Sequence, residues 1–333
     1  MEKSIQAVVL AAGRSTRMKS NRSKVLHEIL GRTILEYLLA TLADCGLKPD
    51  QIIVVVGENE TEVRDKIKVP VKFARQEKQL GTADALLAAT SYCRDFRGDL
   101  LVLVGDNPYL EAGELQRLID HHRRSQAHCT MLSAVFPETP PPYGRVLRDE
   151  RGRVLKVVEE IEASREELLI REVNSSVYVF DNETVFPLLP KIGNDNVKKE
   201  YYLTDVVGML AATGKNVQAL PAGHYRVAIG INNRWELQEA QAYFNRQNLR
   251  RLALEKGVTV LQPETVTVEH GAVVGPDTII QPLTYIGAGT EIGAGCIIGP
   301  LAVLRGEQVP DGARVTGSFK FEKNECIELK EEE

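Results

Sequence analysis

The chain has 333 residues, a mass of 36.9 kDa and a formal net charge of −5 at pH 7. Its 43% hydrophobic and 26% charged residues are typical of a globular protein with about two domains. The acidic balance argues against a nucleic-acid partner, and no apolar run approaches the length of about 18 residues that a membrane span needs. Five scattered cysteines without a CxxC pair argue against a disulfide framework or a zinc site, so we expect reduced thiols and a cytoplasmic location.

Apolar strand-like runs alternate with amphipathic helical stretches over the first 135 residues. The strands are predicted at residues 5–10, 51–57, 71–76, 100–105 and 130–135. The helices are predicted at residues 33–45, 82–93 and 112–125. This alternation predicts an α/β fold with a mostly parallel sheet and helices on both faces. A ligand site in such a sheet lies at the carboxyl ends of the strands, where Asp106 ends the run LLVLVGD.

The pattern changes after the first five strands. Residues 143–179 predict hairpin strands around a turn at residues 149–152, which we interpret as a lid inserted over the sheet. A helix at 203–213 and a short strand follow. Residues 235–256 are charged, helical and free of proline and glycine, which predicts a long arm between two domains.

A six-residue repeat begins beyond Gly257. Apolar residues recur at Val268, Val274, Ile280, Ile286, Ile292, Ile298 and Leu304. Each is followed four residues later by a mostly small residue, at Ala272, Thr278, Thr284, Thr290, Cys296, Ala302 and Gln308. This period predicts a parallel β-helix. Seven hexads at three per coil make about two coils, a short stack that oligomerisation would stabilise.

The loop after the first strand reads LAAGRSTRMKSNRSK over residues 10–24. A glycine-containing loop at a strand end leaves backbone N–H groups free to face an anion. The same loop carries Arg14, Arg17, Arg22 and Lys24, and several cations suit a polyphosphate better than a single carboxylate. The loop therefore predicts a nucleoside triphosphate site, with an ordinary turn bearing solvated charges as the alternative.

Eight motifs occur in one order between residues 5 and 234. They read LAAGRSTRM with Lys24, ARQEKQLGTADA, LVGDNP, YGR, VVEE, EVNSSVY, EYYLTD and GINNR. In this order and spacing they resemble the bacterial N-acetylglucosamine-1-phosphate uridyltransferase family, in which a Rossmann-like domain precedes a helical arm and a left-handed β-helix. The resemblance implies transfer of UMP from UTP to N-acetylglucosamine 1-phosphate, with Mg²⁺ as cofactor and pyrophosphate as leaving group.

The resemblance also implies the nucleotide contacts. These are Leu10, Ala11, Ala12, Gly13, Arg14, Lys24, Gln76, Gly81 and Thr82. A glutamine amide offers a donor and an acceptor, so Gln76 can read the imide edge of uracil with two hydrogen bonds. As alternatives, Gln76 is a polar strand-end residue, and Thr82 is the N-cap of the helix that it opens.

The catalytic, metal and sugar contacts come from the same resemblance. Arg17 would neutralise the leaving pyrophosphate, Lys24 would face the α-phosphate, and Asp106 with Asn232 would hold the metal. Asn232 or Asn233 could instead cap the following helix. The sugar contacts are Gly144, Glu159, Asn174, Tyr202 and Thr204. Two departures leave the exact sugar open: the family's VEHKDA is VEEIEA at residues 158–163, and its NTG is NSS at residues 174–176.

The predicted parts are a nucleotidyltransferase domain at residues 1–232, an arm at 233–256, a β-helix at 257–318 and an acidic tail at 319–333. The family's longer β-helix acetylates glucosamine 1-phosphate. Here the repeats end near Gln308, so we expect no acetyltransferase activity. Family analogy implies a homotrimer, and the alternative is that a two-coil β-helix is too short to form one. The alternatives are another sugar 1-phosphate, dTTP or CTP as the nucleotide, or a non-catalytic regulatory paralogue.

Overall fold

The structure, a computed structural model, describes residues 3–13 and 16–317. Within them the chain forms two compact units. The sheet unit comprises residues up to 27 and residues 34–233, and the β-helix unit comprises residues 28–33 and those from 234 onward. The hairpin at 28–33 therefore groups with the second unit, which the pattern of motifs did not predict. Arg14 and the acidic tail at 319–333 lie outside the described residues.

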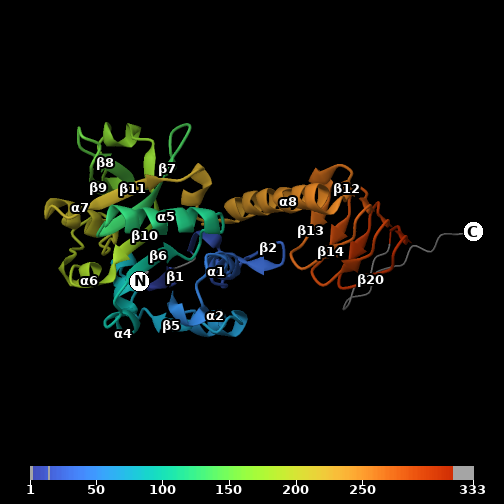
Figure 1. The fold of residues 1–333 in the computed structure, drawn as a ribbon, viewed down its shortest axis with the longest axis horizontal. Coiled ribbons are helices and arrows are strands. Elements are labelled where there is room, and N and C mark those ends of the chain that lie inside the picture. The colour runs from blue at the N-terminus through green and yellow to red at the C-terminus, as the bar shows by residue number, and fades with distance from the viewer. Residues whose placement is uncertain (1–2, 14–15, 318–333) are drawn as a thin grey trace, which may run out of the picture. The chain divides into compact units, whose positions relative to one another are not determined.

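A nine-stranded sheet forms the centre of the first unit. Its main path runs through β11 (Val217–Pro221), β7 (Cys129–Val135), β10 (Glu172–Asp181), β6 (Asp99–Val104), β1 (Ile5–Leu10), β4 (Ile52–Val56) and β5 (Lys72–Arg75) (Figure 1). Only β10 runs against the other strands of this path. The parallel strands therefore end at one common edge, and β10 begins there.

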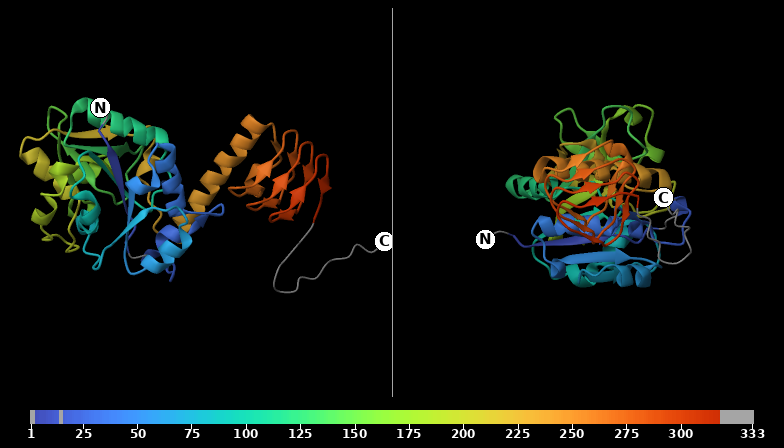
Figure 2. Two further views of the ribbon diagram at one scale, coloured as in Figure 1. Left: turned by 60° about the horizontal axis from the view of Figure 1, so that its bottom comes forward. Right: turned by 90° about the vertical axis from the view of Figure 1, so that its right-hand side faces the viewer.

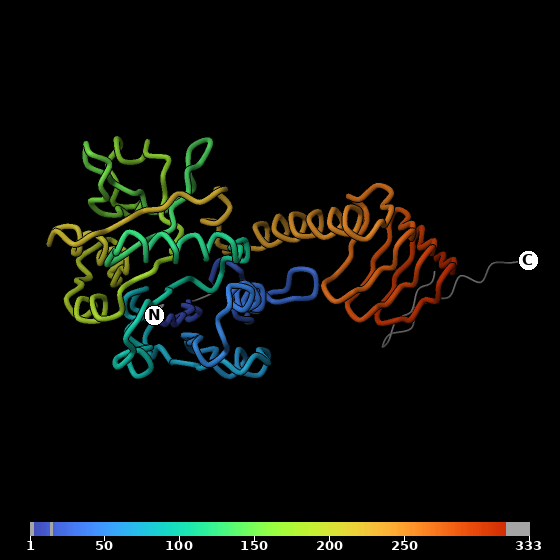
Figure 3. Tube along the Cα trace, viewed as in Figure 1, coloured from blue at the N-terminus to red at the C-terminus, as the bar shows by residue number. Residues whose placement is uncertain are grey.

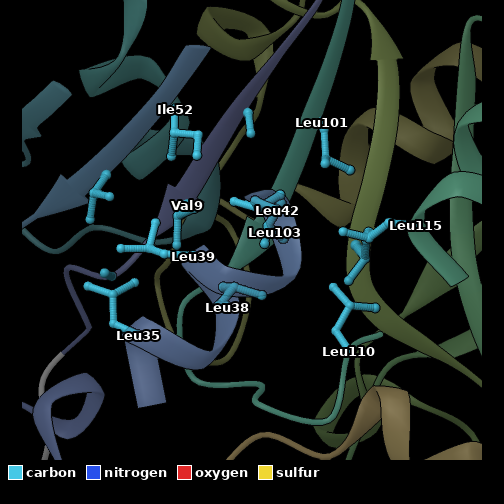
Figure 4. Close-up of a cluster of buried hydrophobic side chains, with 14 of the residues drawn as sticks. Val9, Leu35, Leu38, Leu39, Leu42, Ile52, Leu101, Leu103, Leu110 and Leu115 are labelled. Carbon is cyan, nitrogen blue, oxygen red and sulfur yellow. The ribbon is translucent and has the colours of Figure 1, made fainter. Parts of the chain in front are cut away.

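Helices cover both faces of the sheet, which confirms the predicted α/β fold. One face packs against α1 (Ile34–Asp44), α2 (Glu60–Lys66) and α5 (Ala112–Ser125). The other packs against α3 (Thr82–Ala88), α4 (Thr90–Cys93) and α7 (Thr204–Ala212). Successive residues of β1 serve both cores, because Val9 faces α1 and Val8 faces the opposite helices (Figure 4). Burial on both faces explains why these strands are continuously apolar.

The prediction of a lid over the sheet was wrong for its last strand. β10 lies inside the sheet, between β6 and β7, and only β8 (Arg145–Arg148) and β9 (Val154–Val158) branch from it as a hairpin. The run Val177–Phe180 is buried on both faces, as a central strand requires. The prediction of a lid did not take account of this apolar run, which is typical of a central strand.

The predicted helix at 82–93 is two helices, and α2 was not predicted. α3 and α4 are separated at Ala89, whose N–H bonds to the Leu86 carbonyl three residues back. The Thr90 hydroxyl donates to the Leu87 carbonyl at 2.5 Å and so competes for the helical acceptors. Local hydrogen bonding of this kind does not alter the apolar period from which the helix was predicted.

The second unit contains a parallel β-helix built from short strands, β12 (Thr259–Val260) to β21 (Arg314–Val315). They form three sheets of four, three and three strands, and the coils lie side by side in Figures 2 and 3. The apolar position of every predicted hexad is at most 5% exposed. This arrangement confirms the parallel β-helix that the repeat predicts and is consistent with the left-handed form that the resemblance implies.

The stack is longer than the two coils predicted, since β12 to β21 at three strands per coil make more than three coils. The additional rungs carry Val260, Val309 and Val315, which pack against the same core. Val260 precedes Val268 by eight residues and Val309 follows Leu304 by five, so both miss a strict six-residue period.

Helix α8 (Arg234–Lys256) covers the first coil of the β-helix. Leu249 and Leu252 are buried in the β-helix core, and the side-chain amides of Asn245 and Asn248 donate to the carbonyls of Val266 and Val268. These bonds satisfy a strand edge that would otherwise be open.

The hairpin of β2 (Glu28–Ile29) and β3 (Arg32–Thr33) packs on the same unit. The His270 N–H donates to the Leu30 carbonyl at 3.0 Å, and the Gln241 side-chain amide donates to the Glu28 carbonyl at 3.3 Å. None of the helices in the described part of the chain is long and apolar enough to cross a bilayer.

A buried histidine makes the stability of the sheet unit depend on pH. Burial lowers the pKa of His122 from 6.5 to about 4, against the opposing effect of the Asp99 carboxylate. The unfolded chain therefore takes up this proton first, and stability falls as the pH drops from 6.5 towards 4. The loss is on the order of 3 kcal/mol.

We expect His122→Gln to flatten this fall of stability with pH, measured by urea unfolding followed by circular dichroism. His121→Gln, the neighbouring and more exposed residue, should keep the wild-type slope, and equal slopes for all three proteins would contradict the assignment.

Candidate active site

Four polar side chains from distant parts of the chain meet at the carboxyl edge of the sheet. The Lys24 ammonium forms an ion pair with the Asp106 carboxylate and donates to Asn232 Oδ1 at 3.0 Å. Arg17 donates to the same Oδ1 at 2.9 Å. Lys24 and Asp106 are 16% and 18% exposed, so their charges are largely withdrawn from bulk water. The structure thus brings together all four residues predicted for catalysis and metal binding.

The backbone fixes this meeting point. Asp106 comes two residues after the end of β6. The N–H of the intervening Gly105 bonds to the Leu10 carbonyl, and the Asp106 carbonyl accepts from the Ile231 N–H at 2.9 Å. Gly230 lies directly against the carboxylate, since a Cβ at this position would be 2.9 Å from Asp106 Oδ1. The Asn232 amide donates to the Gly230 carbonyl, which turns its oxygen towards Lys24. Asn232 therefore faces the site, and Gly230 is a contributor that the sequence reading missed.

The loop after β1 forms one wall of a cavity of about 450 Å³. The Ala11 N–H bonds to the Val55 carbonyl, whereas the N–H groups of Ala12 and Gly13 have no hydrogen-bond partner among the described residues. Such N–H groups suit an anion. All predicted nucleotide contacts that the structure describes line this cavity, namely Leu10, Ala11, Ala12, Gly13, Lys24, Gln76, Gly81 and Thr82.

Two details of the nucleotide contacts differ from expectation. The Gln76 amide nitrogen donates to the Gly81 carbonyl at 3.1 Å and to Asp84 Oδ2 at 2.7 Å, so both amide hydrogens are used within the chain. Gln76 then has an acceptor but no spare donor for a ligand, and the predicted two-bond reading does not fit this arrangement. The N-cap of α3 is Gly81, and the Thr82 hydroxyl instead accepts from the Leu203 N–H at 2.9 Å.

The five predicted sugar contacts gather near the start of β10. The Thr204 hydroxyl donates to Glu159 Oε1 at 3.1 Å, and the Asn174 N–H bonds to the Gly144 carbonyl at 2.9 Å. Burial raises the pKa of Glu159, and the bond from Thr204 partly offsets this. The buried Tyr202 hydroxyl lacks a hydrogen-bond partner within the described chain, and burial raises its pKa to about 12. A buried hydroxyl without a partner fits a site that binds polar groups.

Asn174 is held by an irregularity in β10. The register of β10 against β7 shifts between Asn174 and Val177. The Asn174 amide donates to the Tyr178 hydroxyl at 2.6 Å, and its oxygen accepts from the Ser176 N–H at 3.1 Å. Ser176 has a φ of +59°, a conformation that glycine adopts without steric cost. Serine thus occupies the left-handed position where the resembling family has glycine.

The oxygen atoms of the cluster fit a magnesium ion. The Asp106 carboxylate and the Asn232 amide oxygen converge on one cation, the Lys24 ammonium. Among the described residues no group of three or more His, Cys, Asp or Glu side chains could hold a metal. One carboxylate with one amide oxygen, completed by substrate phosphates, is a common magnesium site, whereas tighter all-protein cages suit other metals.

Comparisons with known proteins match both units. Residues 7–174 match the MobA-like NTP transferase domain family, and residues 271–306 match the bacterial transferase hexapeptide family with six repeats. The chain is 43% identical over 276 residues to the bifunctional protein GlmU of Pelotomaculum thermopropionicum, covering 83% of this chain and 60% of that relative. It is 39% identical over 314 residues to the GlmU of Brevibacillus brevis, covering 94% of this chain and 67% of that relative.

The sheet unit also resembles solved structures. A proposed glucose-1-phosphate thymidylyltransferase from Bacillus anthracis aligns with a TM-score of 0.58 at 16% identity, covering 72% of this chain and 95% of that one. At this identity the likeness concerns the fold alone. The chain spans 60% of the length of the Pelotomaculum relative, so the activities of the whole relatives do not carry over by similarity.

The conformation of Ser176 gives a stability prediction. Ser176→Gly removes the steric cost of the positive φ and adds unfolded-chain entropy, for a net gain of about 0.5 kcal/mol. The midpoint of thermal unfolding should rise by about 1–2 °C. Ser176→Ala keeps a Cβ and should give no gain. A glycine variant that melts at or below the wild-type temperature would contradict this account.

Proposed function

Because this chain belongs to the MobA-like NTP transferase family and is a relative of the bifunctional GlmU proteins, we propose that it joins a nucleotide to a sugar 1-phosphate. In the specific form of the proposal, UMP moves from UTP to N-acetylglucosamine 1-phosphate, and pyrophosphate leaves. The observation that carries the proposal is the cluster of Lys24, Asp106, Asn232 and Arg17 beside the cavity. The retained cluster also disfavours a non-catalytic paralogue.

The reaction needs alignment and charge neutralisation more than proton transfer. A phosphate oxygen of the sugar 1-phosphate forms a bond to the α-phosphorus of UTP, and the bond to the bridging oxygen of the β-phosphate breaks. The attacking oxygen is already anionic, so no general base is required. Lys24 would stabilise the negative charge around the α-phosphorus, and Arg17 would stabilise the departing pyrophosphate.

The metal ligands would be Asp106 and Asn232. A bound magnesium ion would supply positive charge to the phosphate oxygens. In the structure Lys24 pairs with Asp106, so binding of nucleotide and metal requires the ammonium to exchange Asp106 for phosphate oxygens. Lys24, Asp106 and Asn232 would then exchange one another for the phosphates and the metal ion, and no side chain would need to change its charge.

The sugar contacts would read hydroxyl groups. Glu159 presents a half-buried carboxylate, and Tyr202 presents a buried hydroxyl without a described partner. Such groups reject a sugar that leaves them unpaired, because a buried polar group without a partner is costly. The choice of N-acetylglucosamine over other sugars follows the family resemblance. The sequence NSS in place of NTG retains the asparagine, Asn174.

We also propose that these 333 residues carry out no acetyl transfer, and that they form a homotrimer by family analogy. His270 is the only histidine among residues 257–333, and its backbone N–H is bonded to the hairpin residue Leu30.

Purified protein with magnesium should release pyrophosphate from UTP and N-acetylglucosamine 1-phosphate. It should release no free CoA from acetyl-CoA and glucosamine 1-phosphate. Sedimentation velocity measures the assembly.

Two substitutions test the cluster. Lys24→Ala should lower kcat by about 100-fold or more, because a cation facing transition-state charge contributes several kcal/mol. Asp106→Ala should abolish turnover by removing the carboxylate ligand. Arg22→Ala is the matched control, since this cation of the same segment is 54% exposed and lies 3.7 Å from Glu62. Near-normal kcat in either cluster variant would overturn the assignment, and circular dichroism checks that the variants fold.

A further inference from the structure

Asp84 holds the amide of Gln76 in one orientation. Gln76 follows β5 and is only 5% exposed. Its Nε2 donates one hydrogen to Asp84 Oδ2 at 2.7 Å and the other to the Gly81 carbonyl at 3.1 Å. Its Oε1 has no hydrogen-bond partner in the described part of the chain. This oxygen is also not among the fully buried polar atoms that lack a partner, so a ligand can reach it. Because Gln76 lines the cavity, Oε1 is the polar atom that it offers to a ligand.

The chemistry of the two partners prevents the amide from turning over. A carboxylate and a carbonyl oxygen are both acceptors, and neither carries a hydrogen to donate. Rotating the amide by half a turn would place Oε1 against these oxygens and leave Nε2 facing the cavity. The resulting loss of two hydrogen bonds, one of them to a charged group, strongly favours the observed orientation.

The positions of both partners are fixed by packing. Asp84 belongs to α3, whose residues Ala83, Ala85 and Leu86 are at most 5% exposed. Gly81 lies close to the segment around Tyr201, since a Cβ on Gly81 would be 2.4 Å from the Tyr201 carbonyl oxygen. The acceptor pair therefore belongs to the rigid part of the fold, and Gln76 takes its orientation from it.

We propose that Asp84 is a positioning residue that sets nucleobase specificity by keeping the acceptor of Gln76 towards the cavity. The inference rests on the proposed function, in which the base of a nucleoside triphosphate lies against Gln76. Uracil and thymine carry a hydrogen on N3 and can donate to Oε1. Cytosine has a lone pair at N3, so it would place an acceptor against an acceptor. The arrangement thus favours UTP and dTTP over CTP and does not distinguish the 5-methyl group.

The test compares three nucleotides with the wild type and Asp84→Asn. Asparagine has nearly the same shape but can either accept from or donate to Gln76, so the amide gains a second orientation. We measure kcat/KM for UTP, dTTP and CTP by pyrophosphate release. The wild type should prefer UTP over CTP by about 100-fold or more, and Asp84→Asn should reduce this ratio by about tenfold. The UTP to dTTP ratio should stay unchanged, because both bases donate from N3.

The ratios separate positioning from general damage. A variant that merely loosens the pocket would move all three nucleotides together, and an unchanged UTP to CTP ratio would overturn the role of Asp84. Asp84→Ala leaves the Gly81 carbonyl as the single partner and should shift the ratio in the same direction, so it provides an answer if Asp84→Asn does not fold. Glu114→Gln removes a first-turn carboxylate from α5, outside the cavity lining, and should change neither ratio. Failure of the wild type to use UTP at all would instead contradict the proposed function.

Discussion

The contact of one ammonium, that of Lys24, with the Asp106 carboxylate and the Asn232 amide oxygen is the interaction on which the site depends. It joins three segments that are distant in sequence at the edge where the parallel strands end. The two acceptors and the cation are half-buried, and each offsets the desolvation cost of the others. Gly230 makes this approach possible, because a side chain there would meet the carboxylate. The atoms that pair with one another in this cluster are therefore those that a charged substrate would use.

Phosphate binding can replace these contacts without leaving a charge unpaired. The ammonium can pass from a carboxylate to phosphate oxygens, and the freed carboxylate can bind a metal ion. Other polar side chains of the sheet unit are fixed instead: Gln76 donates to Asp84 and Gly81, and Asn174 is bonded to Tyr178 and Ser176. Selective group transfer needs cations that can move onto the reacting phosphate. It also needs recognition side chains that keep one orientation.

Much of this could be predicted from the sequence, and the exceptions have physical causes. The strands ending at one edge follow from apolar runs that alternate with helical ones, so Asp106 could be placed beside the loop after β1. The position of β10 inside the sheet depends on pairing with β6 and β7, which a hairpin pattern does not encode. The break at Ala89 depends on local hydrogen bonds that leave the apolar period unchanged. The role of the Thr82 hydroxyl depends on the N–H of Leu203, a residue distant in sequence. The end rungs of the β-helix were missed because their spacing departs from six residues.

By itself the sequence determined the α/β class, the β-helix repeat, the family and the residues that form the cavity, since these follow from periodicity and from motifs at fixed spacing. The loop of residues 10–24 could be interpreted as a candidate phosphate site because its cations and glycine lie close together along the chain. Only the tertiary structure decided which atoms of those residues are free. Gln76 has an acceptor but no spare donor, Asn232 turns its oxygen inward, and Ser176 adopts a positive φ. Each depends on a side-chain hydrogen bond or a backbone conformation of the folded chain, and neither leaves a periodic trace in the sequence.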